Sequence, residues 1–176
     1  YVQALRELLY IDTSAFIRLV FGTEIDPFTT AYFLDGTGFF MNGSSNLTIR
    51  LALLLSYPLC NTYILVSFAF SIFCFYGCWK LFLLFHQLYP HLEKEFAVAC
   101  LFLPSVCFWG TGVLKDPICL GALGTLTYHI YKLFFEKSKI IRRIFVIIIC
   151  FWMLKILKVY IILSFMPAYS FWIIFR

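Results

Sequence analysis

Apolar residues occur in long runs along the chain, and short polar segments separate these runs. An α-helix needs about 20 residues to cross the roughly 30 Å of hydrocarbon in a bilayer. We expect membrane-spanning helices near residues 63–84, 96–109, 118–135 and 144–163, with a partial one over 166–176. The second of these is shorter than ideal. The pattern predicts an all-α, multi-span helical integral membrane protein.

The first 60 residues follow a different pattern. Residues 1–21 place apolar and charged side chains on opposite faces, which is typical of a helix lying along a membrane surface. Residues 22–46 are rich in turn-forming residues and predict a loop, and the short apolar stretch 47–59 predicts a partial or interfacial helix. We therefore expect an outer amphipathic helix and loop region over 1–60, and a transmembrane region over 61–176.

Composition excludes the common soluble classes. The chain is 62% hydrophobic and only 13% charged, whereas soluble domains are roughly 45–50% apolar and about 25% charged. A soluble domain of 176 residues could not bury so much apolar surface. Disordered, collagen-like and ordinary soluble enzyme classes are therefore excluded.

The distribution of charge orients the expected spans. Residues 1–60 carry three basic and five acidic residues, while residues 61–176 carry eleven basic and four acidic ones. The most basic link, 136–143, should be cytoplasmic by the positive-inside rule. Residues 110–117 and the N-terminal region then lie outside. Because the basic residues separate apolar runs, we expect no nucleic acid partner.

The segment 102–124 carries the most informative pattern. A proline, two glycines and a Lys-Asp pair interrupt an apolar run at the membrane boundary. Irregular backbone there is tolerated where it is buried in protein or lines a wet cavity. The segment predicts a cavity mouth formed by Ser105, Trp109 and Thr111, together with the Lys-Asp pair. The alternative is a plain outer hairpin with a solvated pair.

The same orientation gathers several ionisable residues at the outer face. Ionisable residues at membrane depth are costly and usually mark a site. Cations there can hold a phosphate-bearing headgroup, and carboxylates can act as general bases. We expect phosphate or lipid-carrier binding by Lys115, Asp116, Lys155 and Lys158.

Two sequence segments resemble a known family. LPSVCFWGTGVLKD, followed by a basic link and LKILKVYIILSFMPA, resembles the polytopic bacterial membrane proteins of the GT-C superfamily, mainly over residues 46–170. The resemblance implies transfer of a sugar from a polyprenyl-phosphate carrier at the outer side of the bacterial inner membrane. It also implies a catalytic aspartate in the first outer loop, for which Asp12 and Asp35 are the candidates. The family has about twice as many spans, and this chain begins at Tyr1, so we expect a piece of a longer chain.

Two other functions stay open. A non-catalytic membrane subunit would explain the short, interrupted spans, because such spans pack against partner subunits. A transporter would need two matched broken helices, whereas the sequence offers one. Expected partners are membrane lipids, a polyprenyl-phosphate sugar and partner membrane subunits. The cofactor stays open: a divalent metal is a candidate, although no metal-ligand motif is present. Gly121 and Gly124, with Ala122 and Thr125, predict a small-residue face for close helix packing.

Overall fold

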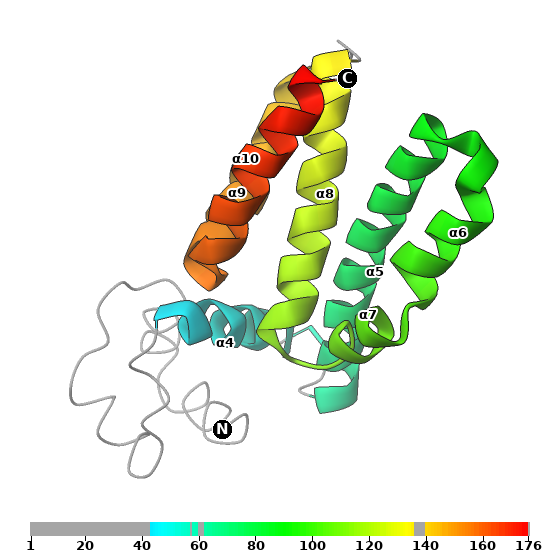
Figure 1. Cartoon of the computed structure of the whole chain (residues 1–176). Helices are drawn as coiled ribbons and strands as arrows, with labels where there is room; N and C mark the ends of the chain where they lie inside the picture. The colour runs from blue at the N-terminus through cyan, green and yellow to red at the C-terminus, as the bar shows by residue number, and fades with distance from the viewer. Residues whose placement is uncertain (1–42, 57, 60–61, 136–139, 176) are drawn as a thin grey trace, which may run out of the picture. The chain divides into compact units, whose positions relative to one another are not determined.

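The structure is a computed structural model that describes residues 43–56, 58–59, 62–135 and 140–175. The chain divides into two compact units, Tyr1–Val66 and Ser67–Arg176. Within the described residues every regular element is helical and no strand occurs, which confirms the all-α prediction (Figure 1).

The described elements follow one another along the chain as a series of helices of very different lengths. They are α4 (Gly43–Ser56), α5 (Tyr63–Leu88), the 3₁₀-helix η2 (Pro90–Leu92), α6 (Glu93–Ala97), the π-helix η3 (Val98–Phe102), α7 (Pro104–Trp109), α8 (Lys115–Phe135), α9 (Ile140–Leu157) and α10 (Val159–Ile174). The helix α4 corresponds to the partial helix expected over 47–59. The amphipathic helix expected over 1–21 lies outside the described residues.

Among the described helices, α5 and α8 are long and apolar enough to cross a membrane. They have 26 and 21 residues and correspond to the spans expected over 63–84 and 118–135. The helix α8 begins three residues earlier than expected. Asp116 in its first turn is favourable beside the positive end of the helix dipole, and Pro117 in that turn removes no intrahelical hydrogen bond.

The span expected over 96–109 is not one helix. The π-helix η3 ends at Phe102, Leu103 is extended with φ −63° and ψ 125°, and α7 begins at Pro104. A proline ring disfavours helical backbone at the preceding residue but fits the first position of a new helix. Pro104 therefore divides this stretch, which does not form the single continuous helix expected over 96–109.

The span expected over 144–163 is also divided. Lys158, with φ −151° and ψ 86°, leaves the helical region and separates α9 from α10. Residues 159–163 form the start of α10, which also contains most of the partial helix expected over 166–176. The sequence around Lys158 is continuously apolar apart from its lysines, so hydropathy gave no sign of this break.

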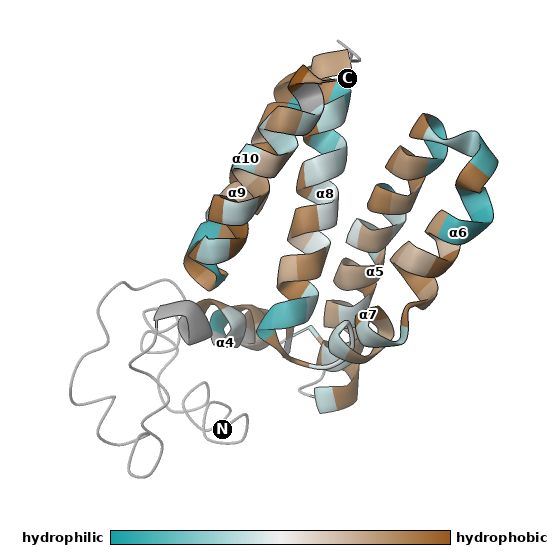
Figure 2. Cartoon of the chain, viewed as in Figure 1, coloured by the Kyte–Doolittle hydropathy of each residue, from teal (hydrophilic) through white to brown (hydrophobic). Residues whose placement is uncertain are grey.

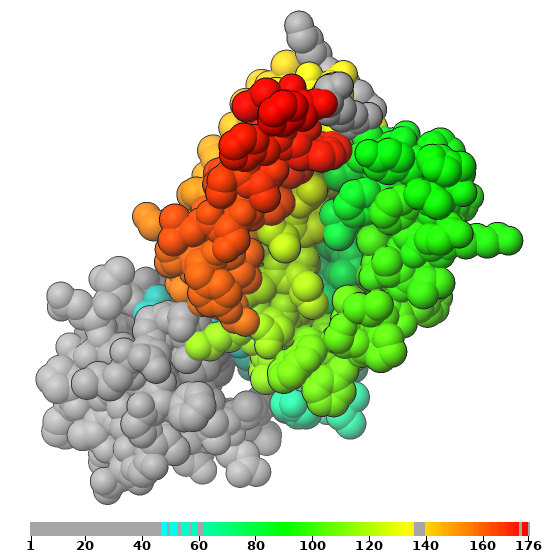
Figure 3. All heavy atoms as spheres, in the orientation of Figure 1, coloured from blue at the N-terminus to red at the C-terminus, as the bar shows by residue number. Residues whose placement is uncertain are grey.

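The chain reverses direction at Lys158. The Arg143 guanidinium, at the start of α9, donates to the Lys132 carbonyl near the end of α8. Lys158, just after the end of α9, pairs with Asp116 in the first turn of α8. On α10, the Tyr169 hydroxyl donates to the Thr127 carbonyl at 3.1 Å. Thus α9 runs antiparallel to α8 and α10 runs parallel to it (Figure 1). Side chains of α10 lie against α8 on the face shown in Figure 3.

Glycines bring α5 and α8 into backbone contact. A Cβ atom on Gly77 would lie 2.3 Å from the Gly121 carbonyl oxygen, and one on Gly124 would lie 2.2 Å from the Gly77 carbonyl oxygen. Ala122 and Thr125 are buried on the same helix. The small-residue face expected on α8 is therefore confirmed, and its partner on α5, Gly77, was not predicted.

Large apolar side chains are exposed on the helices α5, α9 and α10. The helix α5 exposes Phe68, Ile72 and Phe75, and α9 exposes Phe145 and Ile148. The helix α10 likewise exposes Leu163 and Phe171. Figure 2 shows apolar residues along the length of these helices. Monomeric soluble proteins rarely expose contiguous apolar surface of this kind.

Candidate functional site

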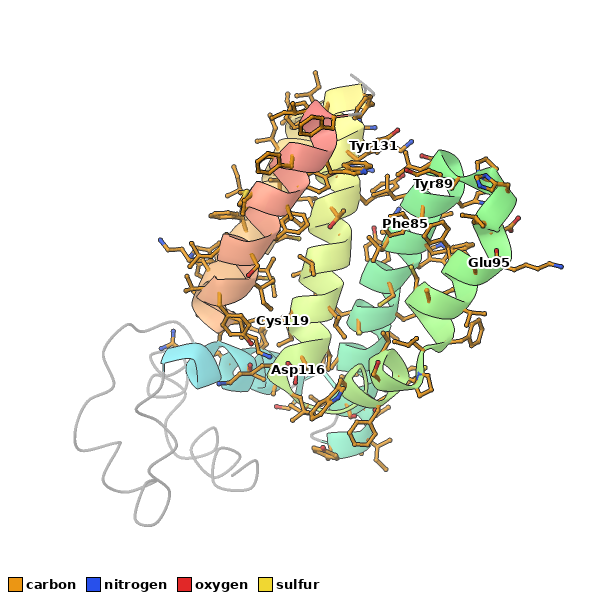
Figure 4. All side chains as sticks on the ribbon, in the orientation of Figure 1. Phe85, Tyr89, Glu95, Asp116, Cys119 and Tyr131 are labelled. Carbon is orange, nitrogen blue, oxygen red and sulfur yellow. The ribbon has the colours of Figure 1, made fainter. Side chains whose placement is uncertain are left out.

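A cavity of about 360 Å³ lies at one end of the second unit. Residues of three elements line one open side of it: α7, the first half of α8, and the turn from α9 into α10. The lining residues are Ser105, Val106, Trp109, Asp116, Cys119, Leu120, Leu123, Lys158 and Ile161. Figure 4 shows Asp116 and Cys119 along the first part of α8.

An ion pair forms the polar end of the cavity. The Lys158 ammonium donates to Asp116 Oδ1, and the two side chains are 25% and 31% exposed. This hydrogen bond raises the pKa of Lys158 above its ordinary value, although partial burial opposes the rise. The Tyr160 ring lies 5.9 Å from the ammonium. The ion pair therefore holds the Lys158 ammonium beside the first turn of α8.

Helical spacing supplies the apolar wall of the cavity. Cys119, Leu120 and Leu123 follow Asp116 at three, four and seven residues, which places them on the same face of α8. Ile161 follows Lys158 by three residues at the start of α10. One charged end and one apolar wall give the cavity the character of a binding site for an amphiphile.

The structure brings four of the residues expected from the sequence into this cavity: Ser105, Trp109, Asp116 and Lys158. The other expected residues in the described part of the chain are not among its lining residues. The Thr111 hydroxyl donates instead to the Phe108 carbonyl at 3.1 Å.

The two remaining lysines are not among the lining residues, and the two expected bases lie outside the described residues. Lys155 is exposed near the end of α9, and Lys115 is the first residue of α8. The catalytic candidates Asp12 and Asp35 lie outside the described residues. Of the four residues expected to bind phosphate, Asp116 and Lys158 therefore line this cavity, and Lys115 and Lys155 do not.

Sequence reasoning missed the apolar half of the site. Cys119, Leu120, Leu123 and Ile161 resemble any other residues of an apolar run, so composition does not distinguish them. The available signal was their helical spacing from Asp116 and Lys158. That signal needed the helix to start at Lys115 and the chain to turn at Lys158, and the sequence predicted neither.

The cavity offers a cation and a hydroxyl to an incoming anion. Asp116 repels an anion, and its described role is to hold Lys158. Within the described residues, no group of three His, Cys, Asp or Glu side chains could hold a metal ion. No family model, curated protein or solved structure matches the chain, so the case for a function rests on the residues of this cavity.

Proposed function

We propose that this chain belongs to a multi-span protein of the bacterial inner membrane. The protein transfers a sugar from a polyprenyl-phosphate carrier at the outer face of that membrane. In this proposal the cavity holds the phosphate end of the carrier. Lys158 binds the phosphate, Ser105 donates a further hydrogen bond, and Leu120, Leu123 and Ile161 contact the first part of the apolar chain.

Exposed apolar surface supports the membrane location. The helix α5 is long enough to cross a bilayer, and Ile64, Phe68 and Ile72 along it are each more than half exposed. Each buried CH₂ group favours transfer out of water by about 0.8 kcal/mol. Contact with lipid would remove these apolar side chains from water. The helices α9 and α10, antiparallel to each other, are proposed to be embedded beside α5 and α8.

The shape of the cavity is the observation that carries the proposal. At about 360 Å³ it falls near the small end of known ligand pockets, which range over about 300–1,000 Å³. It can take a headgroup and the first units of a long chain, while the remainder lies in the bilayer. A charged end beside an apolar wall matches a lipid phosphate better than a free sugar.

Catalysis in this proposal needs a base outside the described residues. Asp116 is engaged with Lys158 and is therefore assigned to positioning that lysine. Asp12 or Asp35 is proposed as the base that activates the acceptor hydroxyl. Lys115, beside Asp116 in the first turn of α8, is proposed to add positive charge near the phosphate.

Binding of a polyprenyl phosphate to the purified full chain in lipid nanodiscs tests the proposal. The same polyprenol without its phosphate should bind at least ten-fold more weakly. Lys158→Ala should lose roughly 10- to 100-fold in affinity for the phosphate form, because a hydrogen bond to a charged group contributes roughly 1.5–3 kcal/mol. Sugar transfer from the corresponding polyprenyl-phosphate sugar should fall in parallel.

Matched variants separate this effect from loss of folding. Lys155→Ala removes an exposed lysine that is not among the lining residues, and it should bind like the wild type. Leu123→Trp should fill part of the cavity and weaken binding of the carrier. Leu163 is exposed on α10, so Leu163→Trp should leave the affinity unchanged. Wild-type affinity in both Lys158→Ala and Leu123→Trp would exclude this cavity as the carrier site.

One observation favours a second candidate, a non-catalytic membrane subunit. The segment from Glu93 to Trp109 is broken at Leu103 into a helical stretch of ten residues, formed by α6 and η3 together, and the six-residue helix α7. Such short helices cannot cross a bilayer alone and would need a partner to cover their main-chain groups. Isolation of the chain in a stable complex, with no binding of a polyprenyl phosphate, would select this function.

A further inference from the structure

The polar end of the cavity carries charges of both signs. Lys158 and Asp116 form an ion pair there, and both side chains line the cavity while they remain 25% and 31% exposed. The pair has no net charge. A ligand that carries a phosphate alone brings negative charge next to the Asp116 carboxylate, and like charges at short range repel each other. This end of the cavity is therefore better matched to a ligand that carries a positive charge beside its phosphate.

The Lys158 ammonium keeps one donor for such a ligand. A lysine ammonium has three N–H donors. One of them donates to Asp116 Oδ1, and a second hydrogen bond joins the ammonium to the Tyr160 side chain. Among the described residues, no acceptor takes the third. Lys158 can thus stay paired with Asp116 and still donate to a phosphate oxygen.

The Asp116 carboxylate keeps acceptor sites on the other side of the pair. An ionised carboxylate has two oxygens with about four acceptor sites. The Lys158 ammonium occupies one of these sites, at Oδ1. In the part of the chain that the structure describes, no other donor is paired with this carboxylate. Asp116 can therefore accept a hydrogen bond from a ligand ammonium, and bonds between two ionised groups are among the strongest in proteins.

The helix α7 adds a contact for each charge. Trp109, which is 50% exposed, and Ser105 both line the cavity from this helix. A tryptophan ring attracts a cation that lies over its face more strongly than the other aromatic rings do, and a serine hydroxyl can donate to a phosphate oxygen. The lining thus contains an aromatic ring suited to an ammonium as well as a hydroxyl suited to a phosphate.

We propose that the cavity binds a phosphate ester that carries an ammonium group on the second carbon from the ester oxygen. The phosphate binds Lys158, and the ammonium binds Asp116. Two sources share this chemistry: a 2-amino sugar on the polyprenyl-phosphate carrier, and the headgroup of an ethanolamine phospholipid. The inference rests on the proposed function in one respect, that the cavity holds a phosphate. It gives Asp116 a direct contact with the ligand in addition to its role in positioning Lys158.

Binding to the purified full chain in a non-ionic detergent at neutral pH tests the proposal. The probes are two matched pairs, and within each pair a hydroxyl replaces the ammonium. The first pair is polyprenyl-phosphate glucosamine and polyprenyl-phosphate glucose. The second is phosphatidylethanolamine and the phospholipid with a hydroxyethyl headgroup. In the pair that represents the ligand, the ammonium member should bind roughly 10- to 100-fold more tightly, the effect of one hydrogen bond between charged groups.

Variants test whether Asp116 is the group that contacts the ammonium. Asp116→Asn should bring the ratio of affinities within the pair close to one, whereas Asp116→Glu should keep part of the preference because it keeps the charge. The ratio is the measured quantity because a displaced Lys158 would change the affinity of both members alike. Glu95→Gln removes an exposed carboxylate on α6 that is not among the lining residues, and it should leave the ratio unchanged.

The outcomes separate this proposal from the proposed function. Equal affinities within both pairs would overturn it, and the proposed function would still stand if polyprenyl phosphate binds more tightly than polyprenol. A preference for phosphatidylethanolamine, with no phosphate-dependent binding of the polyprenyl compounds, would support it and overturn the proposed function. A preference that persists in Asp116→Asn would overturn the contact between Asp116 and the ammonium.

Discussion

Replacing Gly77 by alanine should destabilise the helix bundle by about 1–3 kcal/mol, the usual cost of inserting a methyl group into a close-packed contact. The new Cβ atom would lie 2.3 Å from the carbonyl oxygen of Gly121 and 2.5 Å from its Cα atom. Both atoms belong to main chain, which cannot rotate away as a side chain can. The helices α5 and α8 must therefore move apart, and the midpoint of thermal unfolding should fall by about 3–10 °C.

Gly124 provides an internal test of the same contact. Its Cβ atom would lie 2.2 Å from the Gly77 carbonyl oxygen, so Gly124→Ala should cost a similar amount. Because both substitutions separate the same pair of helices, the double variant should lose less stability than the sum of the two single losses. Additive losses would mean that the two glycines act at unrelated contacts.

A matched control enlarges a side chain at an exposed position. Ala168 is exposed on α10, and Ala168→Leu should leave the unfolding midpoint within about 1–2 °C of the wild type. An unchanged midpoint for Gly77→Ala in the same assay would show that α5 and α8 do not approach each other at this residue.

The glycine contact shows what a sequence can predict about such a fold. The pair Gly121 and Gly124 has the spacing of a small-residue face, and hydropathy indicated the helix that carries it. Gly77 has no Gly, Ala, Ser or Thr three or four residues away on either side, so it forms no small-residue face of this kind. Only the pairing of two helices reveals its role, and hydropathy contains no information on which helices pair.

Of the two helix breaks, one could be predicted from the sequence and the other could not. Pro104 is visible in the sequence, and its effect on Leu103 follows from the geometry of the proline ring. Lys158 has no such signal, because lysine is a good helix former and its neighbours are apolar. Its extended backbone is found together with the ion pair to Asp116, a contact between residues 42 positions apart in the chain.

The charged half of the candidate site could be predicted from the sequence. Ionisable residues in an apolar chain are few, so Asp116 and Lys158 were prominent in the sequence. The sequence grouped Asp116 with its neighbour Lys115, whereas the structure pairs it with Lys158. The identity of charged residues in a site is readable from composition and position, but their pairing depends on how the helices pack.

Removing either partner of the Asp116–Lys158 ion pair should release the turn between α9 and α10 from the start of α8. The two side chains are 25% and 31% exposed, so the pair is neither fully solvated nor fully buried. Breaking a buried pair costs about 3–5 kcal/mol and an exposed one about 0–1 kcal/mol. We expect Asp116→Asn and Lys158→Met each to lower the free energy of unfolding by about 1–3 kcal/mol, an intermediate value.

A double-mutant cycle in nanodiscs isolates the pair from the other contacts of each residue. The double variant should be about 1–2 kcal/mol more stable than the sum of the single losses predicts, since it leaves no unpaired charge behind. The pKa of Lys158 is raised in the folded protein, so its contribution is fully present below the ordinary lysine pKa and is lost only as pH rises through the folded value. The coupling energy should therefore be the same at pH 7 and pH 9. A coupling that disappears at pH 9, or single variants as stable as Lys155→Met, would show that the pair does not hold the turn in place.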